Sequence, residues 1–244
     1  MTKSPYKDRK LLLKDISSFT TRNGAFFKQN AKRMSDLFEM SVYNDAVKYY
    51  RRKKYTISIN NLMRDGTFKY KLTPAGLSEN FSYFVATKKN NKQPDDVVEI
   101  HHNIKVQSHH DPHIYFTADV SVTNEDGVTT QNQKNRKSHS FIPSDALLTF
   151  FEVKNMNPFP EVLFSFTGIL YEVKPEFVLN SSALGISTGK KHLTPSLVFS
   201  GSGGAHVESV ADKLGQRYGC NIIRGLYANK GKIYSYDKLR SYDA

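Results

Sequence analysis

The sequence contains a single cysteine, Cys220, and no long apolar run. One cysteine rules out a disulfide within the chain, which is typical of the reducing cytoplasm. A membrane-spanning helix needs about 18 or more predominantly apolar residues, so no membrane partner is expected. The charged N-terminus is followed by an apolar group, Leu11 to Leu13, that is too short for the core of a signal peptide. We therefore expect a cytoplasmic location.

Internal repeats and low-complexity linkers are also missing, so we expect residues 1–244 to form one domain. A chain of this length with 39% hydrophobic residues can build one substantial core. The first 24 residues are polar and interrupted by Pro5 and Gly24, so no element is expected there.

Acidic residues are in the minority. The chain has 35 Lys and Arg residues against 23 Asp and Glu residues, a formal charge of +12. A protein of this charge is attracted to polyanions, of which nucleic acid is the commonest. The alternative is a soluble protein that is merely basic.

The apolar pattern predicts a first helix within residues 26–54, followed by a β-rich stretch over residues 55–113. Glu39 lies beside the apolar stripe of this helix. Arg51 and Arg52 stand at its end, where cations favour a helix C-terminus.

Alternating strands and helices are predicted for residues 114–228, with a basic tail over residues 229–244. A strand at 114–122, a long polar loop at 123–145 and a strand at 146–154 come first. Helix, strand, helix and strand follow. Strand–helix–strand crossovers imply parallel pairing, whereas the first two strands can pair as a hairpin. The prediction is an α/β fold with a mixed central β-sheet flanked by helices.

The second of these strands ends in two charges. The strand period of two places Glu152 and Lys154 on one face. Leu148 and Phe150 are expected to share that face. Burying a charge costs several kcal/mol unless it is paired or bound, so either the strand end reaches solvent or it forms a metal-binding edge. The same Glu-Val-Lys tripeptide recurs at residues 172–174, where a helix is expected to end.

A metal-binding edge needs a second carboxylate, and two precede Glu152. Asp145 is seven residues away along the same strand, roughly 23 Å at ~3.3 Å per residue. Carboxylates so far apart cannot share one Mg²⁺, whose oxygen ligands lie at about 2.0–2.1 Å. Asp119 lies on the preceding strand, which can return alongside. We therefore prefer Asp119 and place Asp145 at the turn into the strand.

The sequence DVSV at residues 119–122, a long loop and FFEVK at residues 150–154 resemble the PD-(D/E)XK nuclease superfamily, which has the restriction-endonuclease-like fold. The resemblance covers residues 114–200, and residues 26–226 if the first helix belongs to it. Ala118 stands where the family name has proline. The resemblance implies a restriction-endonuclease-like core with a β-rich N-terminal extension.

The resemblance implies a metal-dependent nuclease, acting on DNA in particular, as in restriction or anti-phage defence. Asp119, Glu152 and the backbone carbonyl of Val153 would hold Mg²⁺ or Mn²⁺. Lys154 would position or help to deprotonate the attacking water and offset phosphate charge. Glu39 would add a carboxylate at the rim. The expected catalytic residues are thus Asp119, Glu152 and Lys154.

Basic side chains are the expected nucleic-acid contacts. Lys134, Arg136 and Lys137 lie in the loop between the two acidic strands, and Arg51 and Arg52 end the first helix. A merely solvated loop is the alternative for the first three. A homodimer, or a place in a larger nuclease complex, would suit such a protein.

Two other functions compete with a nuclease. The same fold could serve as a non-catalytic nucleic-acid-binding or assembly subunit, and a protein that binds other polyanions is a third hypothesis. The histidines between His101 and His113 could suit zinc. Structural zinc sites usually include cysteine, so an exposed loop is the preferred interpretation of these histidines.

Overall fold

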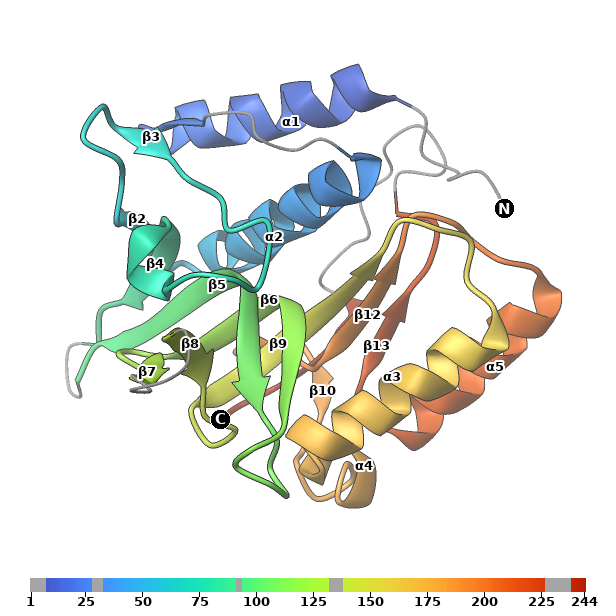
Figure 1. Ribbon diagram of the computed structural model, residues 1–244. Coiled ribbons are helices and arrows are strands. Elements are labelled where there is room, and N and C mark those ends of the chain that lie inside the picture. The colour runs from blue at the N-terminus through green and yellow to red at the C-terminus, as the bar shows by residue number, and fades with distance from the viewer. Residues whose placement is uncertain (1–7, 28–32, 91–93, 132–137, 227–237) are drawn as a thin grey trace.

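The computed structural model describes residues 8–27, 33–90, 94–131, 138–226 and 238–244. None of the described helices is long and apolar enough to cross a membrane. The described residues form both helices and strands (Figure 1). In order they are α1 (Arg9–Arg22), β1 (Phe26–Phe27), α2 (Met34–Arg52), β2 (Thr56–Asn60), β3 (Thr67–Phe68), a 3₁₀ turn (Ser78–Asn80), β4 (Tyr83–Lys88), β5 (Asp96–Gln107), β6 (Tyr115–Asn124), β7 (Thr129–Gln131), β8 (His139–Ile142), β9 (Leu147–Lys154), α3 (Pro160–Val173), α4 (Glu176–Leu179), β10 (Ser187–Thr188), β11 (His192–Leu193), β12 (Ser196–Phe199), α5 (Ala205–Arg217), β13 (Asn221–Ile223) and β14 (Arg240–Tyr242).

A nine-stranded mixed sheet organises the described part of the chain. Its main path is β13-β12-β9-β6-β5-β4-β2, with β8 paired to β5 and β7 paired to β8. Strands β9, β12 and β13 are parallel, whereas β6 is antiparallel to both β5 and β9. Helices α1 and α2 cover one face, and α3 and α5 cover the other (Figure 1). The predicted mixed α/β sheet flanked by helices is confirmed, including its antiparallel pair.

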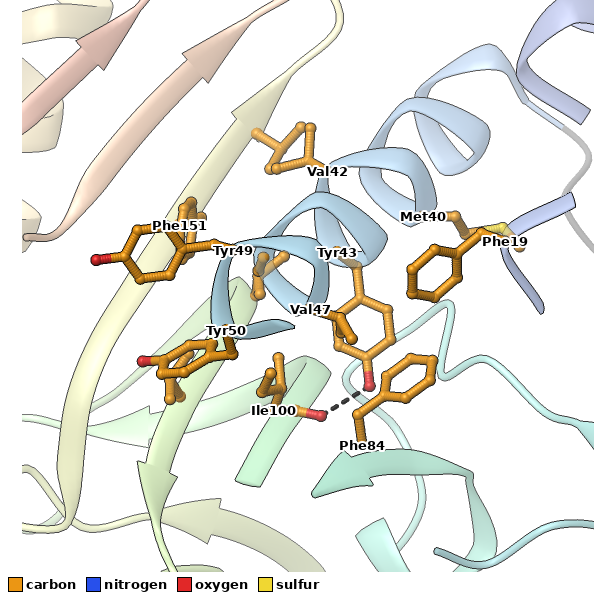
Figure 2. Close-up of a cluster of buried hydrophobic side chains, with 14 of the residues drawn as sticks. Phe19, Met40, Val42, Tyr43, Val47, Tyr49, Tyr50, Phe84, Ile100 and Phe151 are labelled. Carbon is orange, nitrogen blue, oxygen red and sulfur yellow. Dashed lines mark hydrogen bonds between the residues drawn. The ribbon is translucent and has the colours of Figure 1, made fainter. Parts of the chain in front are cut away.

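Helix α2 is held on the sheet by a buried tyrosine. Tyr43 is fully buried, and its hydroxyl donates a hydrogen bond of 2.7 Å to the carbonyl of Ile100 in β5 (Figure 2). Its ring centroid lies 5.4 Å from that of Phe84 and 5.1 Å from that of His102. A buried tyrosine needs such a hydroxyl partner, so the contact fixes where α2 lies over β5. It thereby also fixes the position of Glu39, one helical turn earlier.

Strand β5 changes its core face at Asn103. Val98 and Ile100 pack in the core beneath α2, but Ile104 and Val106 pack in the core beneath α3 and α5. Asn103 lies between them with φ at 50°, in the left-handed region that asparagine tolerates better than most residues. One left-handed residue interrupts the alternation of side chains along β5.

Strand β9 also has an interrupted alternation. The pairing of β6 with β9 shifts register between Val122 and Thr123, as in a β-bulge. Leu148 consequently packs in the core beneath α2, whereas Phe150 packs in the core beneath α3. The prediction that Leu148 shares a face with Phe150 is therefore wrong. The bulge lies before Glu152 and leaves the end of the strand regular.

Helix α1 occupies a stretch for which no element was expected. Asp8 caps it by accepting a hydrogen bond of 2.9 Å from the amide of Leu11. Leu12, Ile16 and Phe19 are buried at spacings of four and three residues. The helical pattern was present in the sequence, but it is short and diluted by polar residues on the other face.

Several predicted boundaries differ from the structure. The first helix, predicted within residues 26–54, begins at Met34, because β1 occupies part of that range. The loop predicted over residues 123–145 contains β7 and β8. Strands β2, β4 and β5 of the 55–113 stretch lie in the central sheet, so they are not an extension beside it. The basic tail over 229–244 ends in β14, and its residues up to 237 lie outside the described part.

Candidate active site

Asp119 and Glu152 meet on adjacent strands. Val120 of β6 pairs with Phe151 of β9 in an antiparallel ladder. The next opposed positions are Asp119 and Glu152, and directly opposed residues in such a ladder have Cα atoms about 4.5–5.5 Å apart. The structure therefore brings together the two carboxylates that the sequence paired. Asp145, in contrast, lies in the turn before β9, where its carboxylate accepts from the amide of Ala146 at 2.9 Å.

Glu152 is a buried carboxylate with one cationic partner. Its side chain is only 9% exposed, and one of its oxygens, Oε1, forms an ion pair with Lys154 Nζ. The other oxygen, Oε2, is buried and has no hydrogen-bond partner among the described residues. Burial, with the nearby charge of Asp119, raises the pKa of Glu152 to about 7. An orphaned buried carboxylate oxygen is costly, so a cation or a hydrogen-bond donor at this atom would stabilise the folded protein.

Asp119 is held by the backbone of the facing strand. Its Oδ2 accepts a hydrogen bond of 2.6 Å from the amide of Val153. Burial raises the pKa of Asp119, although Lys154 and this hydrogen bond act in the opposite direction. The predicted metal ligand at Val153 is its carbonyl, and that role stays a prediction.

Lys154 connects the two acidic strands electrostatically. Burial by itself lowers the pKa of Lys154, but the carboxylates of Glu152 and Asp119 outweigh it and hold the pKa above its usual value. Its ammonium is therefore charged at neutral pH. Its backbone pairs with Phe199 of β12, which fixes the end of β9 within the parallel part of the sheet.

Glu39 reaches the same site from α2. Burial, together with the charge of Asp119, raises the pKa of Glu39 to about 7, while Lys154 lowers it. Asn103 donates from Nδ2 to Glu39 Oε2 at 3.4 Å. Asn103 stands between the paired positions His102–Val120 and Ile104–Ala118, so its partner position across the ladder is Asp119. Sequence reasoning missed Asn103, although an asparagine inside an apolar strand is unusual enough to have marked it.

The site has more buried negative charge than positive charge. Glu39, Asp119 and Glu152 share one part-buried cation, Lys154, whereas the exposed Arg33, which also acts on Glu39, is paired with Asp36. Burial raises the pKa of all three carboxyl groups. Like charges in a buried place disfavour ionisation unless a further cation balances them. A divalent cation would supply that balance.

The residues present fit Mg²⁺ on their donor chemistry. Mg²⁺ takes hard oxygen ligands and is commonly held by one or two carboxylates, with waters completing the shell. Asp119 supplies one carboxylate, and the orphaned Oε2 of Glu152 supplies another. Over the described ranges, no three His, Cys, Asp or Glu side chains are close enough together to hold a metal ion. Glu39 therefore does not complete a three-residue ligand set in this arrangement.

The predicted nucleic-acid contacts are not next to the acids. Arg51 and Arg52 end α2, about 18 Å along the helix from Glu39 at 1.5 Å per residue. Arg51 donates there to the side chain of Asn23. Lys134, Arg136 and Lys137 lie outside the described residues.

The histidines divide into two groups. His101 and His102 are buried in β5, so an exposed-loop interpretation is wrong for them. His109, His110 and His113 are exposed in the loop between β5 and β6, as expected. The ring of His110 stacks on Tyr171 of α3 with centroids 4.8 Å apart, although Tyr171 is itself largely exposed. The two groups therefore do not form one cluster.

Comparison of the chain with protein-family models, with characterised proteins and with solved structures finds no match. What can be said about its function rests on the site itself.

Proposed function

We propose that this protein is a nuclease that requires Mg²⁺ or Mn²⁺ and acts on DNA. The observation that carries the proposal is the convergence of three part-buried or buried acids, Glu39, Asp119 and Glu152, on one lysine, Lys154. A purely structural strand end would neutralise its charges or expose them. Here an excess of carboxylates is retained around an orphaned oxygen, which is costly unless it serves a ligand.

Asp119 and Glu152 are the residues that would hold the metal, with the carbonyl of Val153 as a third oxygen. When bound, the metal would polarise the phosphodiester and lower the pKa of a water ligand. The negative charge of the two carboxylates would attract the cation. Their fixed places on adjacent strands limit how much reorganisation binding requires.

Lys154 and Glu39 are the groups that would handle charge and protons. Lys154 Nζ is already oriented by Glu152, and it would offset the charge of the substrate phosphate or hold the attacking water. Glu39, with a pKa of about 7, can hold or release a proton near neutral pH. Asn103 restrains the Glu39 side chain through Nδ2.

The arrangement of elements is compatible with a restriction-endonuclease-like core, which we propose as the finer description of the fold. A helix that carries an acid, an antiparallel pair that carries Asp-…-Glu-x-Lys, and a crossover helix leading to a parallel strand occur here as α2, β6–β9 and α3–β12. The strands β2, β4 and β5 enlarge the antiparallel side of that sheet.

A cleavage assay tests the proposal. Supercoiled and linear DNA are incubated with the protein in Mg²⁺, Mn²⁺ or EDTA, and single-stranded RNA serves as the second substrate. We expect DNA cleavage that depends on the divalent ion. Binding of DNA without cleavage under either metal would overturn the nuclease, and preferential cleavage of RNA would change its substrate.

One observation favours a second candidate, a non-catalytic nucleic-acid-binding subunit. Glu152 already has Lys154 as an ion-pair partner, and the described residues contain no three-residue ligand group. Calorimetry separates the two functions. Mg²⁺ binding that disappears in Asp119→Asn supports the nuclease, whereas no Mg²⁺ binding to the wild type supports the subunit.

A further inference from the structure

A cavity of about 380 Å³ lies at the far end of α2 from the acids. Lys53, which follows the last residue of α2, is 14 positions beyond Glu39, about 21 Å along the helix axis. The volume falls within the range of about 300–1,000 Å³ that small-ligand sites occupy. Four lysines and two aspartates line the cavity: Lys53, Lys88, Lys190, Lys191, Asp96 and Asp243.

The charge of the cavity is positive even after its ion pairs are taken into account. Asp96 is engaged by Lys191 Nζ at 2.8 Å and also accepts a hydrogen bond from the hydroxyl of Tyr55. Asp243 is 63% exposed and lies 3.9 Å from Lys190, so this pair is weak. The charge of Asp96 is thus neutralised by Lys191, whereas the charge of Lys190 is only weakly offset by Asp243.

The remaining two lysines have no carboxylate within 4.0 Å in the part of the chain that the structure describes. Lys53 Nζ donates to the carbonyl of Gly189 at 2.5 Å, and Lys88 Nζ lies 5.7 Å from the ring centroid of Tyr55. Both contacts orient an ammonium group without neutralising it. Three ammonium groups, those of Lys53, Lys88 and Lys190, therefore come from three separate parts of the chain to one concave surface.

We propose that this cavity binds a phosphate group carried by a nucleotide or by the end of a nucleic-acid strand. A phosphate monoester has a compact double charge, which matches several lysine point charges better than a single carboxylate does. The volume left beyond the phosphate accommodates a sugar. The site lies away from the acids, and the proposal goes beyond the nuclease activity and does not depend on it.

The test compares two double variants that remove the same charge. Lys88→Gln with Lys190→Gln changes the cavity. Lys54→Gln with Lys89→Gln changes exposed neighbours in the chain that do not line it. Melting temperatures confirm that both variants fold. The probes are inorganic phosphate, thymidine monophosphate, and fluorescent oligothymidylate with either a 5′-phosphate or a 5′-hydroxyl, measured by anisotropy and by competition.

We expect the wild type to bind the phosphorylated probes better than the hydroxyl probe. The cavity variant should lose about tenfold or more of this affinity, and the control should stay within about twofold. A gain from the 5′-phosphate of the oligonucleotide identifies a strand end as the source, whereas competition by the mononucleotide alone identifies a free nucleotide. Equal losses in the two variants, or no preference for phosphate, would overturn the proposal. Cleavage is not a readout, so failure of the nuclease leaves this result interpretable.

Discussion

The tripeptide Glu-Val-Lys occurs at residues 152–154 and at residues 172–174, and the two copies have different surroundings. In β9, the glutamate is buried beside Asp119 and pairs with the lysine two residues on. At the end of α3, Glu172 accepts from the hydroxyl of Ser108, and Lys174 pairs instead with Glu176. In a strand, residues two apart share a face; in a helix they lie about 200° apart. The comparison teaches that the tripeptide brings its two charges together beside a second carboxylate only in the copy that lies in a strand.

The largest expected difference between the copies is in cleavage. Glu152→Gln should lower kcat/KM for DNA at least about 100-fold, equivalent to about 2.7 kcal/mol, because it removes a carboxylate proposed to hold the metal. Glu172→Gln should leave the rate within about twofold. The rates are measured on plasmid DNA in Mg²⁺, with circular dichroism as the check on folding. Equal losses of cleavage in both variants would show that the two copies of the tripeptide do not differ in function.

The second-largest difference is expected between the lysines of the two copies, in the rate of cleavage and its pH dependence. Lys154→Met should lower cleavage by about tenfold or more through the loss of an oriented cation. Lys154 also lowers the pKa of Glu152, so its removal should move the acidic limb of the pH–rate profile to higher pH. Lys174→Met, which breaks only the pair with Glu176, should leave the profile in place. A profile unchanged in Lys154→Met would disprove the coupling.

Removing Glu39, one of the three crowded acids, should increase the free energy of unfolding. The pKa of Glu39 is about 7 in the folded protein and lower in the unfolded chain, so its contribution to stability is full at acidic pH and is lost as pH rises through 7. Glu39→Gln removes this loss. At pH 8 we expect stabilisation by about 1–2 kcal/mol, or roughly 3–6 °C in Tm, and a smaller gain at pH 5.

Glu172→Gln is the matched control for that measurement, since it removes an acid that lies in the second copy. The difference in Tm between Glu172→Gln and the wild type should not increase from pH 5 to pH 8. Thermal scans at both pH values provide the comparison. A gain in Glu172→Gln as large as that in Glu39→Gln would attribute the effect to net charge alone.

The smallest expected effect is on stability and concerns the copy at residues 172–174. The hydroxyl of Ser108 donates to Glu172 and accepts from the amides of His110 and Asp111 at 3.0 and 3.1 Å. Ser108→Ala should therefore destabilise the β5–β6 loop by about 1 kcal/mol, measured by urea unfolding, with no change in cleavage. A loss of cleavage in this variant would mean that the second copy takes part in function.

Patterns of regular period predicted the elements that surround the site. The apolar alternation of β6 and β9, and the helical stripes of α2 and α3, follow directly from side-chain spacing. The mismatches occur where one residue interrupts a period. Asn103 reverses the faces of β5 by its left-handed backbone, and the register shift at Val122 moves Leu148 to the other core. The register shift leaves no trace in the local composition. Asn103 is an unusual residue for its strand, but its identity does not by itself show that its backbone is left-handed.

By itself, the sequence determined the mixed α/β class, the pairing of Asp119 with Glu152 and the exclusion of Asp145, because these depend on strand period and reach. Only the tertiary structure decided that Asn103 joins the acids and that Arg51 does not. It also decided that lysines from distant segments surround one cavity. The physical reason is that strand and helix periods are local, whereas burial, charge balance and concavity arise when segments far apart in the chain pack together.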